Sequence, residues 1–261
     1  MFPVYDEKGP RYSDFRPWVT WSIVAINTLI AIVLELLPGV FVSAIAYQLG
    51  VVPVVVTGTV SADEAGLVIR PELTLLTYGF IHAKWSHLAS NMLVLWVFGD
   101  NIERATGHLR FLLFYLLCQL AGVLAHILSD PGSVAPAIGA SAAVSGVVAA
   151  YLLVRPRARV VMLVLGVMTV NFPAYWVIGG WLAWQLAEFL MFRSDTDIAY
   201  WGHFGGFVTG LVLILPLRRS GVRILGERGP RAALQAGMIG ARRGWRHLRR
   251  ATDVLLLRRQ R

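Results

Sequence analysis

The chain has 261 residues, of which 56% are hydrophobic and only 15% are charged. Soluble domains carry about 25% charged residues, so this composition excludes an ordinary soluble enzyme and predicts a membrane protein. The formal net charge of +9 is concentrated at one end, because residues 218–261 contain thirteen arginines and two acidic residues. The single cysteine, Cys118, excludes a disulfide framework and a zinc site built from cysteines.

Six apolar segments approach the length of about 20 residues that a helix needs to cross a bilayer. They occupy residues 18–38, 79–99, 109–129, 137–154, 173–192 and 200–217. The mixed-charge stretch before the first segment does not read as a cleaved signal peptide. We therefore predict an all-α polytopic membrane protein, with an N-terminal segment over residues 1–17, a six-helix domain over 18–217 and an arginine-rich tail over 218–261.

Two further segments are apolar but do not fit a spanning helix. Residues 39–78 are interrupted by glycine and proline, so we expect an irregular segment in the membrane interface. Residues 160–169 are short and are followed by Pro173. We expect them to form a re-entrant or interfacial segment or to extend a neighbouring helix.

The distribution of lysine and arginine orients the spans. With six spans the two termini share one side of the membrane, and that side carries 21 of the 24 basic residues. Basic residues concentrate on the cytoplasmic side, so both termini are expected there. The basic tail is expected to lie on anionic lipid, and no motif in it indicates nucleic-acid binding.

Polar side chains near the outer ends of three predicted spans point to a shared site. His87 and Asn91 are four residues apart in the second span and therefore lie on one face of a helix. Ser141 lies about 6 Å into the fourth span, at 1.5 Å per residue, and His203 lies at a similar depth in the sixth. Such side chains are costly in lipid and usually face the bundle interior or a water-filled cavity. We expect them to gather toward the outer leaflet.

Small residues recur every four positions in the fourth and sixth spans. They are Ala142, Gly146 and Ala150 in the fourth span, and Gly202, Gly206 and Gly210 in the sixth. This spacing lets transmembrane backbones approach closely. Contact between the two spans would bring Ser141 near His203, and a hydroxyl nucleophile requires a base within hydrogen-bond reach.

Each of these residues has an ordinary structural interpretation when it is taken alone. A serine in a transmembrane helix usually packs or bonds to the backbone, and we interpret Ser145 in this way. A single membrane histidine serves equally as a proton relay or as a structural hydrogen-bonding group. Only the joint placement of Ser141 and His203 favours nucleophilic catalysis.

Three motifs in chain order resemble the rhomboid family of intramembrane serine proteases, over residues 72–217. GAS at 139–141 is similar to the GxSG box of the family, HFGG at 203–206 to its HxGG motif, and HLASN at 87–91 to its second-span pattern. The resemblance implies a rhomboid-like six-helix bundle in which Ser141 is the nucleophile and His203 the general base. It also implies that His87 and Asn91 stabilise the oxyanion, with no metal or cofactor.

The chain departs from the family pattern at three places. Ala142 replaces the last glycine of the GxSG box, and Leu73-Thr74 replaces a Trp-Arg pair in the loop before the second span. Ser145 stands where some members carry an aromatic residue that stacks on the histidine. Other polar residues have structural interpretations: His82 and Lys84 in the outer interface, and Asp195 and Asp197 as solvated loop charges.

The sequence therefore predicts a serine endopeptidase that cleaves in or near transmembrane segments through a Ser141–His203 dyad. We expect it in a bacterial plasma membrane, with its site toward the outer leaflet and transmembrane proteins as substrates. The fifth span, rich in bulky residues, is a candidate lateral gate. The alternatives are a catalytically inactive relative that binds transmembrane helices, and a small transporter, which the absence of internal repeats disfavours.

Overall fold

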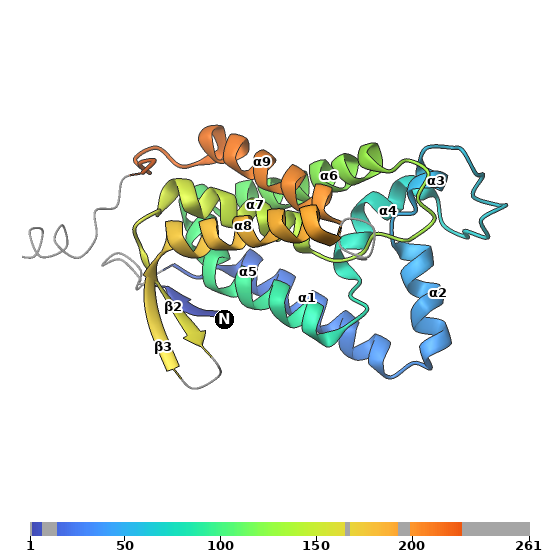
Figure 1. The fold of residues 1–261 in the computed structure, drawn as a ribbon, viewed down its shortest axis with the longest axis horizontal. Coiled ribbons are helices and arrows are strands. Elements are labelled where there is room, and N and C mark those ends of the chain that lie inside the picture. The colour runs from blue at the N-terminus through green and yellow to red at the C-terminus, as the bar shows by residue number, and fades with distance from the viewer. Residues whose placement is uncertain (1, 7–14, 165–167, 193–198, 226–261) are drawn as a thin grey trace, which may run out of the picture.

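The computed structural model describes residues 2–6, 15–164, 168–192 and 199–225, in which long helices run side by side along one axis (Figure 1). The shortest of them has 14 residues. Each overlaps one of the predicted spans. They are α1 (Trp18–Glu35), α5 (Trp85–Thr106), α6 (His108–Ser129), α7 (Ser141–Val154), α8 (Ala174–Phe192) and α9 (Tyr200–Leu217).

Within the described residues, three helices are long and apolar enough to cross a membrane by length and composition: α1, α6 and α9. Helix α7 is equally apolar but has only 14 residues. At 1.5 Å per residue it spans about 21 Å, less than the hydrocarbon thickness of about 30 Å. Helix α7 is therefore too short to cross the hydrocarbon layer alone.

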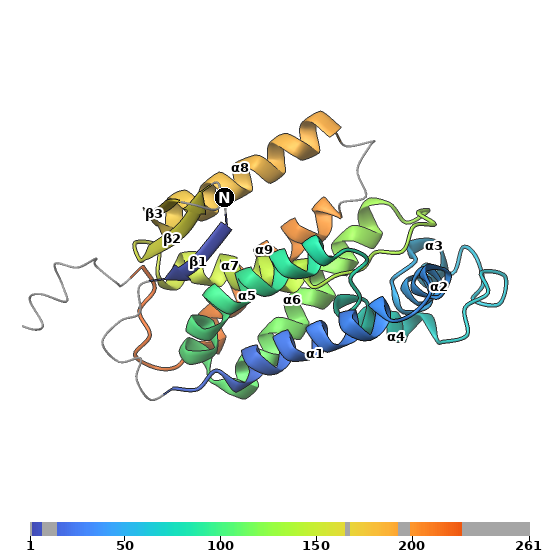
Figure 2. The same ribbon diagram turned by 90° about the horizontal axis from the view of Figure 1, so that it is seen from below.

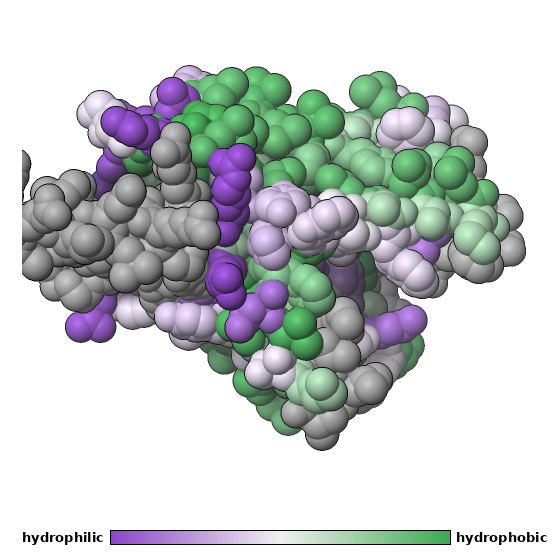
Figure 3. All heavy atoms as spheres, turned by 60° about the vertical axis from the view of Figure 1, so that its left-hand side comes forward, coloured by the Kyte–Doolittle hydropathy of each residue, from purple (hydrophilic) through white to green (hydrophobic). Residues whose placement is uncertain are grey.

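Hydrophobic side chains cover much of the surface of the bundle. Large apolar residues on α1, α6 and α8 are exposed, with Leu29 at 61%, Leu109 at 80% and Trp184 at 65% of their possible area. Figure 3 shows such side chains over much of one face, with hydrophilic ones mainly toward the left of the view. An exposed apolar surface of this extent suits lipid rather than water.

Polar contacts join the helix ends at one end of the bundle. The carboxylate of Glu103 on α5 accepts hydrogen bonds from the backbone N–H groups of Val19 and Thr20 at 3.0 and 2.7 Å. These N–H groups belong to the first turn of α1, which has no intrahelical acceptor for them. Beyond α9, the Arg219 N–H donates to the Ala105 carbonyl of α5 at 2.7 Å. Glu103 is thus a structural partner of the first turn of α1.

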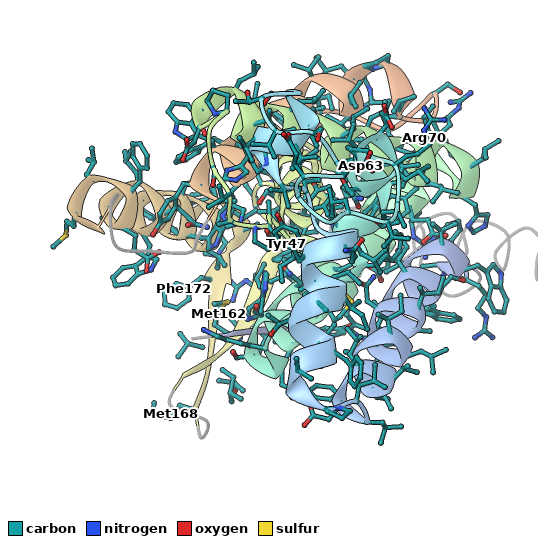
Figure 4. The ribbon with its side chains drawn as sticks, turned by 90° about the vertical axis from the view of Figure 1, so that its right-hand side faces the viewer. Tyr47, Asp63, Arg70, Met162, Met168 and Phe172 are labelled. Atoms are coloured by element: carbon teal, nitrogen blue, oxygen red, sulfur yellow. The ribbon has the colours of Figure 1, made fainter. Side chains whose placement is uncertain are left out.

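At the other end, residues 39–78 contain more helix than we predicted. They form α2 (Gly39–Leu49), α3 (Pro53–Val56), α4 (Pro71–Thr77) and the 3₁₀ turn η1 (Tyr78–Phe80). Figure 4 looks onto this end, where Tyr47, Asp63 and Arg70 lie on the side of the bundle that faces the viewer. The glycine and proline residues bound short helices instead of preventing them, because proline is tolerated in a first helical turn, as at Pro53 and Pro71.

Residues 160–169 do not extend a neighbouring helix, so that alternative of the prediction is wrong. The chain forms an antiparallel pair there, β2 (Arg159–Val164) and β3 (Met168–Pro173), and β1 (Phe2–Asp6) adds to the free edge of β2. Figure 4 shows Met168 near the far end of this pair, with Met162 and Phe172 closer to the helices. Valine at 160, 161 and 164 favours strand over helix, because β-branched side chains pack well on a pleated surface.

A buried polar network fixes strand β1 to the helices. The Asp6 carboxylate accepts hydrogen bonds from Tyr151 Oη at 2.8 Å, Arg155 Nη1 at 3.0 Å and Asn101 Nδ2 at 3.1 Å. Asp6 and Arg155 are only 2% and 4% exposed. A buried charge is tolerated when it is paired and hydrogen-bonded, so this network joins the N-terminal strand to α5 and α7.

Helices α7 and α9 contact each other through their backbones. A side-chain Cβ at Gly206 would collide with the backbone carbonyl of Ala142, and one at Gly210 with that of Gly146. The expectation of close contact between these spans is therefore confirmed. The third glycine, Gly202, faces α6 instead, where its ideal Cβ would lie 3.6 Å from the carbonyl of Gly122.

The Asp6 network predicts a large effect of one N-terminal residue. Asp6→Ala removes one partner of the buried ion pair with Arg155, and breaking a buried pair in this way destabilises a protein by about 3–5 kcal/mol. We expect a lower thermal unfolding midpoint in detergent or lipid. Glu72→Ala, which removes a carboxylate from an exposed pair with Arg70, is the control and should have little effect. Equal midpoints for the two variants would contradict this account of the network.

The backbone contact between α7 and α9 makes a second prediction. Gly210→Ala places a methyl group on the Gly146 carbonyl, and such overpacking costs about 1–3 kcal/mol. The matched control is Gly180→Ala on α8, because nothing lies within 4 Å of an added Cβ there. Thermal unfolding should show a loss of stability for Gly210→Ala alone. A wild-type midpoint for that variant would show that the helices are not in backbone contact.

Candidate active site

Ser141 is the first residue of α7 and is introduced by an unusual backbone turn. Gly139 has a φ angle of +106°, a conformation that residues with a Cβ rarely adopt. An added Cβ at Gly139 would also lie 2.5 Å from Cε1 of His87. The glycine therefore allows both the turn into α7 and the close approach of the histidine ring.

The loop before Ser141 is held by hydrogen bonds to the segment that precedes α5. The backbone N–H groups of Ala137 and Val51 each donate to the carbonyl of the other, at 2.8 and 2.9 Å, and the Gly139 N–H donates to the Tyr78 carbonyl at 2.9 Å. Tyr78 Oη in turn donates to the Gln119 carbonyl of α6 at 2.6 Å. These bonds join the loop before Ser141 to the segment before the second span, in which Leu73-Thr74 replaces the Trp-Arg pair of the family.

Ser141 and His203 lie within hydrogen-bond distance. The Nε2 atom of His203, in the first turns of α9, is 2.8 Å from the Ser141 Oγ atom. Both side chains are partly exposed. The glycine contacts between α7 and α9 bring the two residues together, in the geometry of a hydroxyl nucleophile and its base.

The methyl group of Ala142 does not separate α7 from α9. It points toward α6, where an added Cβ at Gly122 would lie 2.5 Å from it. The absence of a side chain at Gly122 therefore accommodates the extra methyl group, while the Ala142 backbone still faces Gly206. The prediction that Ser145 bonds to the backbone is confirmed, because its Oγ donates to the Ser141 carbonyl at 2.7 Å.

His87, Asn91 and His82 form a polar cluster beside the serine. The Asn91 Nδ2 atom lies 3.1 Å from His82 Nε2, and the two histidine ring centroids are 5.0 Å apart. The Ala140 N–H, directly before Ser141, also donates to His82 Nε2 at 3.4 Å. His82 is 6% exposed and links α5 to the serine loop. It was expected in the outer interface, so its contact with the site was missed.

Helix α8 places a residue on the second nitrogen of the His203 ring. The Gln185 Nε2 atom lies 2.9 Å from His203 Nδ1, and Gln185 is only 7% exposed. Sequence reasoning missed this residue. The available signal was its position on the buried stripe of α8, with Ala174, Ile178 and the partly buried Trp181 at helical spacing.

Within the described residues, no group of three or more histidine, cysteine, aspartate or glutamate side chains is arranged to hold a metal ion. Cys118 is a buried free thiol. The predictions for Asp195, Asp197 and most of the basic tail fall at positions that the structure does not describe. The described part of the site thus consists of a hydroxyl, imidazoles and amides.

Comparison with known proteins identifies several relatives that are rhomboid proteins. The chain is 27% identical over 148 residues to Rhomboid protein 1, mitochondrial, of Saccharomyces cerevisiae, covering 55% of this chain and 41% of that protein. It is 31% identical over 144 residues to the Rhomboid protease GluP of Bacillus subtilis, covering 55% of this chain and 26% of the relative. It is 32% identical over 156 residues to the human presenilin-associated rhomboid-like protein, mitochondrial, covering 58% of this chain and 39% of the relative.

The matches thus span less than half the length of each of these relatives. The profile of the Rhomboid domain matches residues 70–220, which include α5 to α9 and every residue of the candidate site. This stretch is more than half of the chain. This chain is therefore a multi-pass membrane protein that belongs to the rhomboid family.

Proposed function

We propose that the chain is an intramembrane serine endopeptidase that hydrolyses peptide bonds in or near the transmembrane segments of other proteins. The observation that carries the proposal is the 2.8 Å separation of Ser141 Oγ and His203 Nε2. Membership of a family that includes a rhomboid protease supports the reaction class. In the proposed reaction, Ser141 Oγ is the nucleophile and His203 Nε2 transfers the protons.

His203 acts as a general base in the first step. Its Nε2 atom takes the proton of Ser141 as Oγ attacks the substrate carbonyl carbon. The tetrahedral intermediate then collapses, and the imidazolium gives its proton to the leaving amine. A water molecule, activated by the same nitrogen, hydrolyses the resulting acyl-enzyme and restores the serine.

Donors for the developing oxyanion lie around the first turn of α7. The Ser141 N–H belongs to the start of a helix, where backbone N–H groups lack intrahelical acceptors and the helix dipole favours negative charge. His87 and the Asn91 amide supply side-chain donors from α5. Because His82 contacts both Asn91 and the Ala140 N–H, it holds α5 and the serine loop in register.

Helix α8 supports the proposal of a lateral entrance for substrates. It lies along the edge of the bundle opposite α1 (Figure 2), and it carries exposed apolar side chains, including Trp176 at 65% and Leu190 at 71%. A substrate helix must unwind locally to present a peptide bond, because its backbone groups are already paired in lipid. We expect substrates with helix-weakening residues near the outer end of the membrane segment.

The orientation follows from the basic residues. Arg104, Arg155 and Arg159 lie at the end of the bundle that holds the start of α1 and the end of α9. The positive-inside rule places that end in the cytoplasm and Ser141 toward the outer leaflet. The proposed location is a bacterial plasma membrane, with the arginine-rich tail on anionic lipid.

Replacement of either member of the dyad tests the activity directly. Ser141→Ala and His203→Ala should each abolish cleavage of a transmembrane reporter protein in proteoliposomes and labelling by a fluorophosphonate, which requires an activated serine. Ser145→Ala is the control, because its hydroxyl bonds within α7 and should not be needed for activity.

Cleavage that persists in Ser141→Ala would exclude a serine mechanism. Wild-type protein that neither cleaves nor reacts with the probe, but binds the reporter, would establish instead the alternative of an inactive relative that binds transmembrane helices.

Asn91 allows a test of oxyanion stabilisation. Loss of one oxyanion donor lowers kcat by about 10²–10³-fold, so Asn91→Ala should reduce kcat to this extent with little change in KM. The neighbouring Ser90→Ala serves as the control, because Ser90 Oγ donates to the His87 carbonyl in its own helix. A kcat for Asn91→Ala within twofold of the Ser90→Ala value would remove Asn91 from the mechanism.

A further inference from the structure

We propose that Gln185 is the positioning residue for the catalytic base: its amide oxygen accepts the Nδ1–H of His203 and thereby keeps Nε2 free to accept the Ser141 proton. The inference rests on the proposed protease function and adds a third member, on α8, to the dyad on α7 and α9.

Gln185 lies within hydrogen-bond distance of the proposed catalytic base. Its amide lies 2.9 Å from His203 Nδ1, while His203 Nε2 lies 2.8 Å from Ser141 Oγ. The three side chains therefore form a continuous line of polar contacts across three helices. Trp181, one turn earlier on α8, lies 6.5 Å from the His203 ring and 6.4 Å from the Phe207 ring. Two successive turns of α8 thus contact the imidazole.

The tautomer of His203 depends on the hydrogen-bond partner of its Nδ1 atom. A neutral imidazole has one N–H and one acceptor nitrogen, and the hydrogen bond at one nitrogen determines the state of the other. A general base needs Nε2 as acceptor, which requires the proton on Nδ1 and an oxygen to receive it. Among the described groups, the Gln185 amide is the partner within hydrogen-bond distance of Nδ1.

The amide can present either of its ends to the ring. With its Nε2 toward His203, the amide donates to Nδ1, so the ring proton resides on the ring Nε2 and is directed at Ser141. A half-turn about the last side-chain bond exchanges the amide nitrogen and oxygen. The Nδ1–H then donates to Gln185 Oε1, and the Ser141 hydroxyl donates to His203 Nε2. This second arrangement is the productive one.

A neutral amide suits this position better than the aspartate of soluble serine proteases. Burying a carboxylate among apolar side chains of a membrane helix is costly, and such groups are rare there. An amide oxygen still fixes the ring and stabilises the imidazolium through its dipole, as asparagine does in papain-like proteases. In the proton transfer, Gln185 only retains its hydrogen bond to Nδ1–H, and the Ser141 proton moves to His203 Nε2.

Two substitutions separate this role from simple packing. Gln185→Met keeps the approximate volume but has no oxygen acceptor, so we expect kcat to fall by about 10²-fold, within the range that general-base catalysis contributes. KM for the transmembrane reporter should not change. Gln185→Glu keeps an oxygen at the same position and should recover most of the lost kcat. Both effects are measured in proteoliposomes at a series of pH values.

A matched control removes a buried amide elsewhere. Asn27 on α1 is fully buried, and its amide donates within its own helix to the Ile23 carbonyl at 2.9 Å. Asn27→Leu should retain the wild-type kcat. The rate of fluorophosphonate labelling reports the reactivity of Ser141 without substrate binding, and it should fall in Gln185→Met and be unchanged in Asn27→Leu.

The pH dependence of Gln185→Glu keeps the test decisive if Gln185→Met fails to fold. A carboxylate next to Nδ1 favours the protonated ring, so the acid limb of the kcat profile should move to higher pH. Among the described residues, the other titratable side chains whose charge acts on His203 are His87 on α5 and His126 on α6, and both are unchanged in the variant.

Several outcomes would overturn the inference. They are a wild-type kcat in Gln185→Met, a folded Gln185→Glu that is as slow as Gln185→Met, and an acid limb that does not move in Gln185→Glu. Each of these leaves the protease function intact as long as the wild-type protein cleaves and Ser141→Ala does not. If the wild-type protein does not cleave the transmembrane reporter, the proposed function itself is refuted.

Discussion

The contact between the backbones of α7 and α9 is the constraint on which the rest of the structure depends. Gly206 and Gly210 have no side chains where the carbonyl groups of Ala142 and Gly146 lie, so the two helices approach as closely as backbones allow. This approach sets the distance between Ser141 and His203. A larger residue at either glycine would separate the helices by more than the tolerance of a hydrogen bond, so packing and chemistry share the same residues.

Buried polar contacts determine the orientation of the remaining helices relative to α7 and α9. The Asp6 network joins the N-terminal strand to α5 and α7, and Glu103 caps the first turn of α1. At the opposite end, Tyr78 and His82 hold the loop that leads to Ser141. Packing between apolar helices is not directional in lipid, so hydrogen bonds of this kind supply specific orientations.

The helical core of the fold and the pairing of Ser141 with His203 could be predicted from the sequence, because both depend on local signals. Apolar length marks the spans, and small residues four apart mark the faces that touch. The strands at 159–173 could not be predicted, because a short apolar run is compatible with a strand or a helix until its partner is known. The partner, β1, lies more than 150 residues earlier in the chain.

Gln185 and His82 were missed for a related reason. Each is a single polar residue whose significance arises only when a distant segment is placed beside it. The spacing of residues within α8 shows that Gln185 shares a face with Trp181, but it does not show that α9 packs against that face. The methyl group of Ala142 is a similar case, because the space for it depends on Gly122 of a third helix.

Helix α8 is hydrogen-bonded to the strand region at its first residue, and it also contacts His203 through Gln185. Its first residues are bonded to the strand region, through Ala174 N–H to the Ala158 carbonyl at 2.9 Å, while much of the surface farther along α8 is exposed. The same helix carries the contact to His203 Nδ1. A displacement of α8 away from α9 would therefore also move the amide away from the imidazole. Under the proposed lateral entry of substrates, Ser141 would lose its oriented base when α8 moves outward and regain it when α8 returns.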